Sequence, residues 1–263
     1  MIIDFHTHTF PDRIANSALS TLSKKANLTP CTDGTAKDTD QKMRIWGVDK
    51  RVMLSIATNP KQQTNVNNFA IEMNNNDTVF AFGSIHPEAD NAEEELERLK
   101  NAGISGIKLH PEYQNFAIDD KKMYPIYEKC IKLGLVIVFH AGKDLAYPDS
   151  LNASPEAIYR LSRDFGGADF VMAHFGSCML YEKALEFVAG CGFYIDTSFS
   201  KGRISPSLAE SIIKKQGADK VLFGSDCPWE TSLDNFNFIN SLNLTDEEKD
   251  LIFYKNALKL LKK

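Results

Sequence analysis

Short apolar runs alternate with longer amphipathic segments along the whole chain, and this alternation restricts the fold more than any other feature. The runs are rich in Val, Ile and Phe and contain few polar residues. Parallel strands that are covered by helices have this composition, because neither of their faces meets water. Eight strands are predicted, at residues 2–6, 51–57, 79–86, 106–110, 135–140, 170–174, 193–197 and 221–226.

The segments between the runs carry the end signals of helices. Residues 93–102 are acidic at their start and carry Arg98 and Lys100 near their end, as the helix dipole favours. Ser154 precedes Pro155, which gives an N-cap followed by proline in the first turn. The predicted helices are residues 93–102, 119–133, 154–165, 179–189, 205–216 and 245–261.

Strand followed by helix, repeated eight times, predicts a closed (β/α)8 barrel of the α/β class. Such barrels typically need about 250 residues, and this chain has 263. We therefore expect a single TIM-barrel domain over residues 1–263. In this fold the carboxyl ends of all strands meet at one mouth, where active sites lie.

Composition and charge argue against several classes of partner. The formal net charge is -5, which gives no electrostatic reason to expect nucleic acid or an acidic membrane surface. The five cysteines are scattered and form no C-x-x-C pair, so a disulfide framework and a thiolate zinc site are not indicated. We expect neither a targeting leader nor a membrane span, because the first residues lack a basic region with an apolar core and no apolar run approaches the roughly 20 residues that span a bilayer. We expect a cytoplasmic protein, and a homodimer is compatible with the sequence.

One long interval separates the first two predicted strands. Within it, residues 27–41 are polar and lack periodicity, which predicts a loop. Loops that follow barrel strands lie at the catalytic mouth. This loop could therefore serve as a lid or a substrate wall, and an ordinary surface loop is equally compatible.

Residues that bind metals or move protons lie at the ends of most predicted strands. Because these ends converge in a barrel, side chains that are distant in sequence would meet there. Along a strand, alternate side chains share a face, so His6 and His8 can bind one ion together. The distribution of the whole set indicates a metal site: His6, His8, His86, His110, His140, His174 and Asp226.

Four motifs together resemble the amidohydrolase superfamily, and most closely its amidohydrolase-2 group, which includes aminocarboxymuconate-semialdehyde decarboxylase. The motifs are Asp4-Phe5-His6-Thr7-His8, Val138-Phe139-His140, Met172-Ala173-His174 and Gly224-Ser225-Asp226-Cys227-Pro228-Trp229. The resemblance implies one divalent metal ion held by His6, His8, His140 and Asp226, with His174 as the catalytic acid or base.

The chemistry of these residue types agrees with the implied roles. Three imidazoles and one carboxylate suit Zn²⁺, and Mn²⁺ is compatible with the same ligands. Zinc can lower the pKa of a bound water to about 7. His174 could orient that water, and Asp226 could accept its proton and pass it to a leaving group, which makes both residues catalytic candidates.

Lys108 raises the alternative of a second metal ion. It lies two residues before His110, so both side chains share the inward face of the fourth strand if His110 points inward. Many two-metal members of the superfamily use a carboxylated lysine on this strand as a bridge. The closer resemblance is to one-metal enzymes, so we expect one ion and do not favour a bridge at Lys108.

Several residues near the predicted mouth are candidates for substrate binding. Cations there would suit a small substrate that bears a carboxylate, to which arginine can donate two parallel hydrogen bonds. Ordinary solvated loop charges are the competing interpretation. The candidates are Lys108, His110, Arg203 and Trp229.

Three activities compete at the level of sequence. We favour a metal-dependent hydrolase that attacks a small amide, lactone or ester with an activated water. A metal-dependent non-oxidative decarboxylase would use the same ligands and would release carbon dioxide from a small carboxylate. A phosphoesterase is less favoured, because such enzymes need an Asp-x-His near the end of the chain, where this one has Asp226-Cys227-Pro228.

Overall fold

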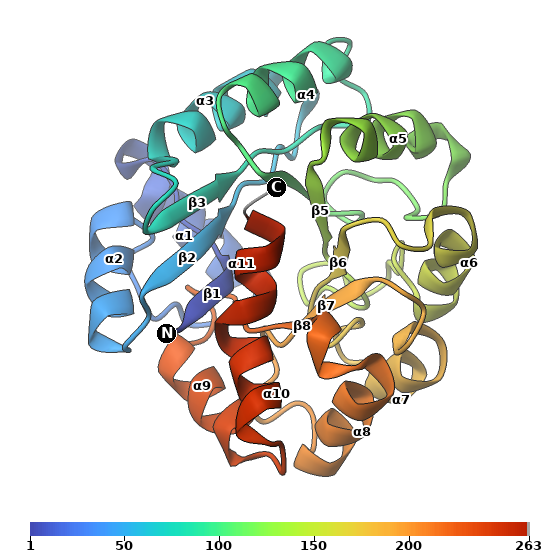
Figure 1. Cartoon of the computed structure of the whole chain (residues 1–263). Helices are drawn as coiled ribbons and strands as arrows, with labels where there is room; N and C mark the ends of the chain where they lie inside the picture. The colour runs from blue at the N-terminus through green and yellow to red at the C-terminus, as the bar shows by residue number, and fades with distance from the viewer. Residues whose placement is uncertain (262–263) are drawn as a thin grey trace.

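The computed structural model describes residues 1–261, and its strands form a ring that helices surround (Figure 1). All strand pairs are parallel, and each strand overlaps one of the predicted apolar runs. The strands are β1 (Ile3–Thr7), β2 (Lys50–Leu54), β3 (Val79–Phe82), β4 (Gly106–Leu109), β5 (Val136–Phe139), β6 (Phe170–Met172), β7 (Tyr194–Asp196) and β8 (Val221–Leu222).

Two ladders make up the ring, β1-β2-β3 and β4-β5-β6-β7-β8, and backbone hydrogen bonds join them at both seams. Between β3 and β4, the Gly83 amide donates to the Gly106 carbonyl at 3.1 Å, and the Lys108 amide donates to the Gly83 carbonyl at 2.8 Å. Between β1 and β8, the Phe5 amide donates to the Phe223 carbonyl at 2.7 Å. The predicted barrel fold is therefore confirmed.

Helices surround the strands, and many begin at a side-chain cap. Ser154, Ser205 and Thr245 each accept a hydrogen bond from a backbone amide in the first helical turn. The α-helices are α1 (Asp12–Ala26), α2 (Ala36–Ile45), α3 (Gln63–Met73), α4 (Ala92–Asn101), α5 (Tyr124–Leu133), α6 (Pro155–Phe165), α7 (Tyr181–Lys183), α8 (Pro206–Gln216), α9 (Ser232–Ser241), α10 (Asp246–Asp250) and α11 (Asn256–Leu261).

All six predicted helical segments contain helix. Two of them include a π-helical turn, Ala184–Val188 after α7 and Leu251–Lys255 between α10 and α11. The prediction of a loop over residues 27–41 is partly wrong, because α2 begins at Ala36. The reason is local: the Thr35 hydroxyl accepts a hydrogen bond from the Asp38 amide and starts a helix in a polar stretch that lacks an apolar stripe.

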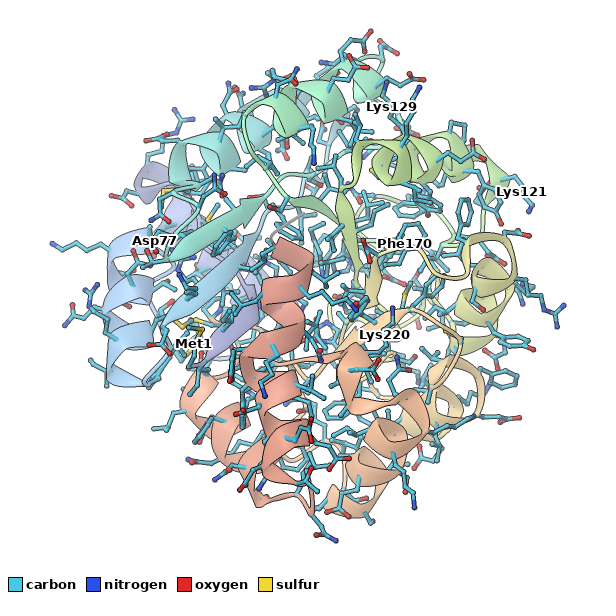
Figure 2. The ribbon with its side chains drawn as sticks, in the orientation of Figure 1. Met1, Asp77, Lys121, Lys129, Phe170 and Lys220 are labelled. Atoms are coloured by element: carbon cyan, nitrogen blue, oxygen red, sulfur yellow. The ribbon has the colours of Figure 1, made fainter. Side chains whose placement is uncertain are left out.

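Apolar side chains fill the barrel interior and the layer between strands and helices. The interior cluster includes Phe5, Val138 and Tyr194 from the strands, and Leu260 and Leu261 of α11 pack against it. Helix α11 crosses one end of the ring in Figure 1 and covers this interior. In Figure 2, Phe170 lies inside the ring of helices, whereas Lys121 and Lys129 point outward from its rim.

None of the helices within residues 1–261 combines the length and the apolar character that a bilayer span requires.

The seam between β3 and β4 depends on a glycine, which gives a test of the packing. A Cβ atom at Gly106 would lie 2.4 Å from a Phe82 ring carbon and 2.5 Å from the Val136 carbonyl oxygen. We expect Gly106→Ala to lower the free energy of unfolding by about 1–3 kcal/mol, as overpacking typically does. Urea unfolding measures the effect, with Ser105→Ala as a control at the adjacent position. Equal unfolding midpoints for Gly106→Ala and the wild type would contradict this account of the seam.

Candidate metal centre

The inward-facing positions of the strands form an apolar layer that gives way to polar residues at the carboxyl ends. On β7, Tyr194 belongs to the interior core, and Asp196 and Ser198 follow at alternate positions. On β5, His140 follows Val138 in the same way. Every one of these side chains is buried. The barrel therefore ends in a buried polar layer above an apolar one.

A β-bulge places the two histidines of β1. The pairing of β1 with β2 shifts register between Asp4 and Thr7. Phe5 packs in the barrel interior, so regular alternation would turn His6 away from it. The shift instead brings the His6 and His8 rings together, with centroids 5.2 Å apart and planes at 70°. Bulges re-aim side chains in this manner near functional sites.

His6, His8 and Asp226 converge on one point. Nε2 of His6 and Nε2 of His8 lie 3.2 Å and 3.1 Å from the same Asp226 oxygen, Oδ1. The other ring nitrogens are hydrogen-bonded elsewhere: His6 Nδ1 donates to Asp196 at 2.8 Å, and His8 Nδ1 donates to the Leu54 carbonyl at 2.9 Å. In these tautomers both Nε2 lone pairs face a carboxylate oxygen.

Three acceptors that face one another need a cation between them. Metal-binding histidines typically donate their second ring N–H to a carboxylate or a carbonyl, as His6 and His8 do here. Burial lowers the pKa of His6 well below 6.5, which keeps its ring neutral and able to bind a metal. Burial also raises the pKa of Asp226, because a lone carboxylate is poorly solvated there. The donor set therefore fits a divalent metal ion.

The backbone at the mouth is strained in several places. His174, Phe175, Phe199 and Asp226 have φ angles of 61°, 55°, 53° and 68°, a left-handed conformation that is uncommon for residues other than glycine. Such residues cluster at functional sites, where the surrounding structure holds them. Gly224 has a related role, because a Cβ there would lie 2.9 Å from the His6 Cβ. The chain accepts unfavourable local geometry in order to present His174 and Asp226.

His140 and His174 form a second part of the cluster. Nδ1 of His140 lies 3.1 Å from Nε2 of His174, and the His174 ring stacks on His6 with centroids 5.1 Å apart. Burial lowers the pKa of both rings well below 6.5. Among residues 1–261, the three-residue group around Asp226 contains His6 and His8, whereas His140 is grouped with His110 and Asp144.

The group of His110, His140 and Asp144 is a poorer metal site than the first. The two rings are stacked nearly parallel, at 8° and with centroids 4.2 Å apart. Lone pairs lie in the ring plane, so parallel stacked rings direct them side by side rather than to one point. His110 Nδ1 accepts from the Tyr113 amide at 3.4 Å, so the proton of the neutral ring is on Nε2, which lies 3.3 Å from Asp144 Oδ2.

Lys108 is a buried ammonium group beside the site. Its side chain is 1% exposed, and Nζ lies 3.3 Å from His6 Nε2. Burial lowers the pKa of Lys108 to about 8, although Asp196 and Asp226 oppose the shift. Within residues 1–261 no carboxylate lies within ion-pair distance of this ammonium. A buried charge without a paired carboxylate lowers the stability of the folded protein.

The remaining predicted substrate residues are less central. The Arg203 guanidinium forms an ion pair with Glu230 and lies over the Phe199 ring, 3.6 Å from its centroid. Trp229 is partly exposed, and its amide donates to the Asp226 carbonyl at 2.8 Å. His86 lies outside the cluster: its Nδ1 accepts a hydrogen bond from the Glu88 amide.

Sequence reasoning gave no role to Asp196 and Ser198. Asp196 Oδ2 binds His6, and the Ser198 hydroxyl lies 2.8 Å from His174 Nδ1. The signal was available, because the predicted strand at residues 193–197 puts Tyr194 and Asp196 on one face, and the same alternation extends to Ser198 just beyond it. A carboxylate two residues beyond a buried tyrosine had to point into the barrel.

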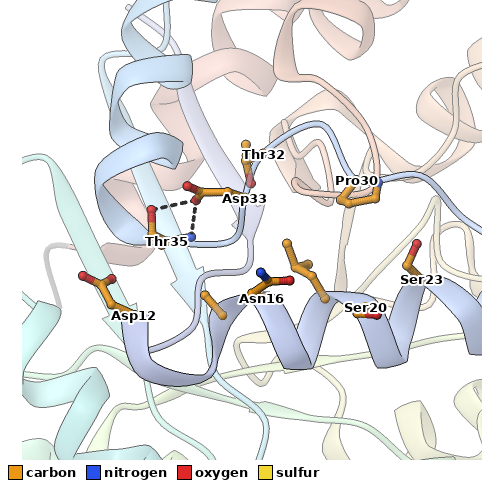
Figure 3. A pocket seen from close by; sticks show the side chains of 10 residues that line it. Asp12, Asn16, Ser20, Ser23, Pro30, Thr32, Asp33 and Thr35 are labelled. Atoms are coloured by element: carbon orange, nitrogen blue, oxygen red, sulfur yellow. Dashed lines mark hydrogen bonds between the residues drawn. The ribbon is translucent and has the colours of Figure 1, made fainter.

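The segment after β1 reaches across to other loops of the mouth. The Lys25 ammonium at the end of α1 lies 3.5 Å from the centroid of the Tyr147 ring, in the loop after β5. The Cys31 amide donates to the Pro228 carbonyl at 2.8 Å, in the loop after β8. A cavity of about 410 Å³ lies between α1 and residues 30–35, and its lining includes none of the site histidines (Figure 3).

Several proteins of known structure are similar to this chain over nearly its whole length. A dihydroxybenzoic acid decarboxylase from Polaromonas, solved with manganese and 2-nitroresorcinol bound, matches with a TM-score of 0.72 and 15% identity over 99% of this chain and 96% of that one. A 5-carboxyvanillate decarboxylase from Sphingomonas paucimobilis matches with a TM-score of 0.69 and 16% identity over 99% and 98%.

A probable 2-pyrone-4,6-dicarboxylic acid hydrolase from Acinetobacter baumannii, solved with citric acid bound, matches with a TM-score of 0.69 and 19% identity over 100% of this chain and 99% of that one. No curated protein sequence matches the chain. The sequence model of the amidohydrolase family Amidohydro_2 matches residues 3–263. With its strand-end histidines and Asp226 gathered at the barrel mouth, the chain belongs to this amidohydrolase family.

Proposed function

We propose that this protein is a metal-dependent, non-oxidative decarboxylase of a small carboxylate. The observation that carries the choice of a carboxylate substrate is the buried Lys108 ammonium, which lacks a paired carboxylate and touches a histidine of the metal centre. Two of the structurally similar proteins are decarboxylases of carboxylate substrates. The sequence alone favoured hydrolysis, and the similarity to these decarboxylases moves our preference to decarboxylation.

The metal centre of the proposal consists of His6, His8, His140 and Asp226. The first, second and fourth of these converge in the structure, and the sequence resemblance supplies His140. When bound, the ion would act as a Lewis acid that polarises an oxygen atom of the substrate. Manganese in one structurally similar decarboxylase supports Mn²⁺ beside Zn²⁺ as the native ion. A second ion bridged at a carboxylated Lys108 is not part of the proposal.

Lys108 would bind the substrate through its carboxylate. Once an ion uses the His6 Nε2 lone pair, the Lys108 ammonium loses its present acceptor, 3.3 Å away. A substrate carboxylate would replace that acceptor and neutralise the buried charge. The preference for an anionic substrate thus follows from the charge that the site itself leaves unpaired.

The reaction needs one proton at the carbon that loses its carboxyl group. The C–C bond breaks, carbon dioxide leaves, and the bonding electrons stay on the carbon, where a proton joins them. His174 is the group best placed to move that proton, because it is buried beside His6 and its Nε2 lies 3.1 Å from His140 Nδ1 within the cluster. Asp226, whose pKa is raised by burial, is the second candidate.

Hydrolysis is the alternative function. It is favoured by the similarity to a probable 2-pyrone-4,6-dicarboxylic acid hydrolase and by the same donor set, which would equally support attack by water. That hydrolase also takes a carboxylate by its name, so Lys108 would bind its substrate in either reaction. The two functions differ in which substrate bond is broken, a C–C bond or a lactone, amide or ester bond. They do not differ in how the substrate carboxylate is bound.

We expect the metal-loaded protein to release carbon dioxide from at least one member of a panel of small aromatic and unsaturated carboxylates. His174→Ala should lower kcat by about 10²- to 10⁴-fold, the usual contribution of a general acid or base. Carbon dioxide release and product mass spectrometry measure both reactions at once. His86→Ala serves as the control, since it removes a histidine outside the cluster. Lactone or amide opening without carbon dioxide release would favour the hydrolase instead.

Metal content tests the ligand set directly. Because each ligand supplies a lone pair that no neighbour replaces, His6→Ala, His140→Ala and Asp226→Ala should each lose stoichiometric metal. His174→Ala should retain it. Inductively coupled plasma mass spectrometry of the purified variants gives the answer, with His86→Ala as the control. A metal-loaded His140→Ala protein would remove His140 from the set, and a metal-free His174→Ala protein would add His174 to it.

Lys108 predicts a pH dependence of substrate binding. The ammonium binds the carboxylate only when protonated, and burial sets its pKa at about 8, so KM should rise as the pH increases through about 8. Lys108→Gln should raise KM at pH 7 by roughly 10- to 100-fold, which corresponds to about 1.5–3 kcal/mol for a hydrogen bond to a charged group. Steady-state kinetics from pH 6 to pH 9 would test both. A KM that follows pH equally in Lys108→Gln would show that another group titrates.

A further inference from the structure

Asp196 is the most heavily hydrogen-bonded side chain of the cluster. It is fully buried, and its two oxygens face different partners. Oδ2 accepts from His6 Nδ1 at 2.8 Å. Oδ1 accepts from the His174 amide at 2.9 Å, the Ser198 amide at 3.0 Å and the Ser198 hydroxyl at 2.5 Å. Every one of these contacts requires Asp196 to act as an acceptor.

The contact with Asp196 fixes the proton of His6. A carboxylate can only accept, so the proton of the neutral His6 ring must be on Nδ1. Nε2, which lies 3.2 Å from Asp226 Oδ1, is then unprotonated. Asp196 therefore determines which nitrogen of His6 can bind a metal ion.

Ser198 extends the same control to His174. Because the Ser198 hydroxyl donates its proton to Asp196, its lone pairs are left to accept from His174 Nδ1, 2.8 Å away. The proton of neutral His174 is then on Nδ1, and its unprotonated Nε2 faces His140 Nδ1 at 3.1 Å, which is unprotonated as well because His140 Nε2 donates to the Lys143 carbonyl at 3.3 Å. The amide of His174, in its left-handed conformation, is held by the same carboxylate.

Ser198 is not placed to react with a substrate. It is fully buried, and its hydroxyl is surrounded by Asp196, His174 Nδ1 and His6 Nδ1, the last at 3.1 Å. These contacts involve the Nδ1 side of both rings, whereas Nε2 of His6 faces Asp226. A nucleophilic role for Ser198 would require access that it does not have.

We propose that Asp196 and Ser198 are positioning residues that together set the tautomers of His6 and His174, and so couple metal binding to proton transfer. This inference rests on the proposed function for the role of His174, but its metal-binding half does not depend on which substrate is turned over. Neither residue touches the reacting atoms, and both act through the rings that do.

Asp196→Asn tests the metal-binding half. Asparagine can accept hydrogen bonds through its single side-chain oxygen only. The three N–H and O–H donors that now bond to Asp196 Oδ1 should keep that oxygen on their side. The amide NH₂ would then face His6 Nδ1 and force the ring proton onto Nε2, the metal-binding nitrogen. We expect Zn²⁺ and Mn²⁺ affinity to fall by about 10- to 100-fold, as is typical for loss of such partners.

Isothermal titration of the metal-free protein with Zn²⁺ or Mn²⁺ alone measures this, and needs no substrate. Ser200→Ala is the matched control, because Ser200 is a buried hydroxyl two residues from Ser198 that bonds the Thr197 carbonyl and Asn235 instead. Thermal unfolding checks that each variant is folded. Wild-type affinity in folded Asp196→Asn would overturn the inference while leaving the decarboxylase proposal intact.

Ser198→Ala tests the proton-transfer half, and carries the test alone if Asp196→Asn does not fold. In this variant the remaining acceptor near His174 Nδ1 is the backbone carbonyl of residue 198. It lies 3.4 Å away, which is too distant for a good hydrogen bond. Nitrogen-15 NMR of the metal-free protein should show His174 in the Nδ1–H tautomer in the wild type and in Ser200→Ala, and a mixture of tautomers in Ser198→Ala. An unchanged tautomer in Ser198→Ala would refute the role of Ser198.

Turnover separates positioning from simple destabilisation. If Ser198 acts through His174, Ser198→Ala should lower kcat by about 10- to 100-fold with KM and metal content unchanged. A purely structural defect would lower the amount of folded protein and leave kcat per folded molecule as it was, which would count against the proposal.

Discussion

The structure of the site depends on a conflict between acceptors. Two imidazole nitrogens lie within 3.2 Å of the same carboxylate oxygen in a place from which water is largely excluded. Uncompensated, this arrangement is unfavourable, because acceptors repel and buried polar groups need partners. The fold maintains it by anchoring the far side of each histidine ring, on Asp196 for His6 and on the Leu54 carbonyl for His8. A cation at the centre relieves the conflict, so the energy stored in it becomes metal affinity.

The barrel can maintain this arrangement because its lower half is apolar and closely packed. Phe5, Val138 and Tyr194 fill the interior below the polar layer, and α11 covers the opposite end. Rigid strands beneath the site allow the residues above them to adopt left-handed backbone at His174 and Asp226 without local rearrangement. Gly224 permits the close approach of His6 that the arrangement needs. The close packing of the apolar layer thus stabilises the strained backbone of the polar layer above it.

Sequence patterns were sufficient for the barrel, since the eight apolar runs and the helix-end signals are local properties that every strand and helix repeats. They were insufficient wherever one interaction reversed a local preference. The helix at Ala36 follows from one hydroxyl cap in a polar stretch, and the orientation of His6 follows from a bulge that alternation does not predict. The convergence of His6, His8 and Asp226 could be foreseen from topology, whereas the contact of His140 with His174 depends on side-chain geometry. Asp196 could have been found from strand alternation, but its fourfold role as an acceptor could not.

The positions of the charged groups in the site suggest which residue would bind the substrate of a decarboxylation and which would take part in its chemical step. Lys108 would meet the substrate carboxylate before any bond breaks, so its attraction stabilises the ground state at least as much as the transition state. Such uniform binding improves capture of the substrate but cannot lower the barrier from the bound complex. As carbon dioxide departs, negative charge would move from the carboxylate to the carbon, away from Lys108, and a proton delivered there would neutralise it. The residue that controls turnover must therefore be the one that moves the proton, and the buried position of His174, held by Ser198 and Asp196, makes it the side chain on which the rate would depend.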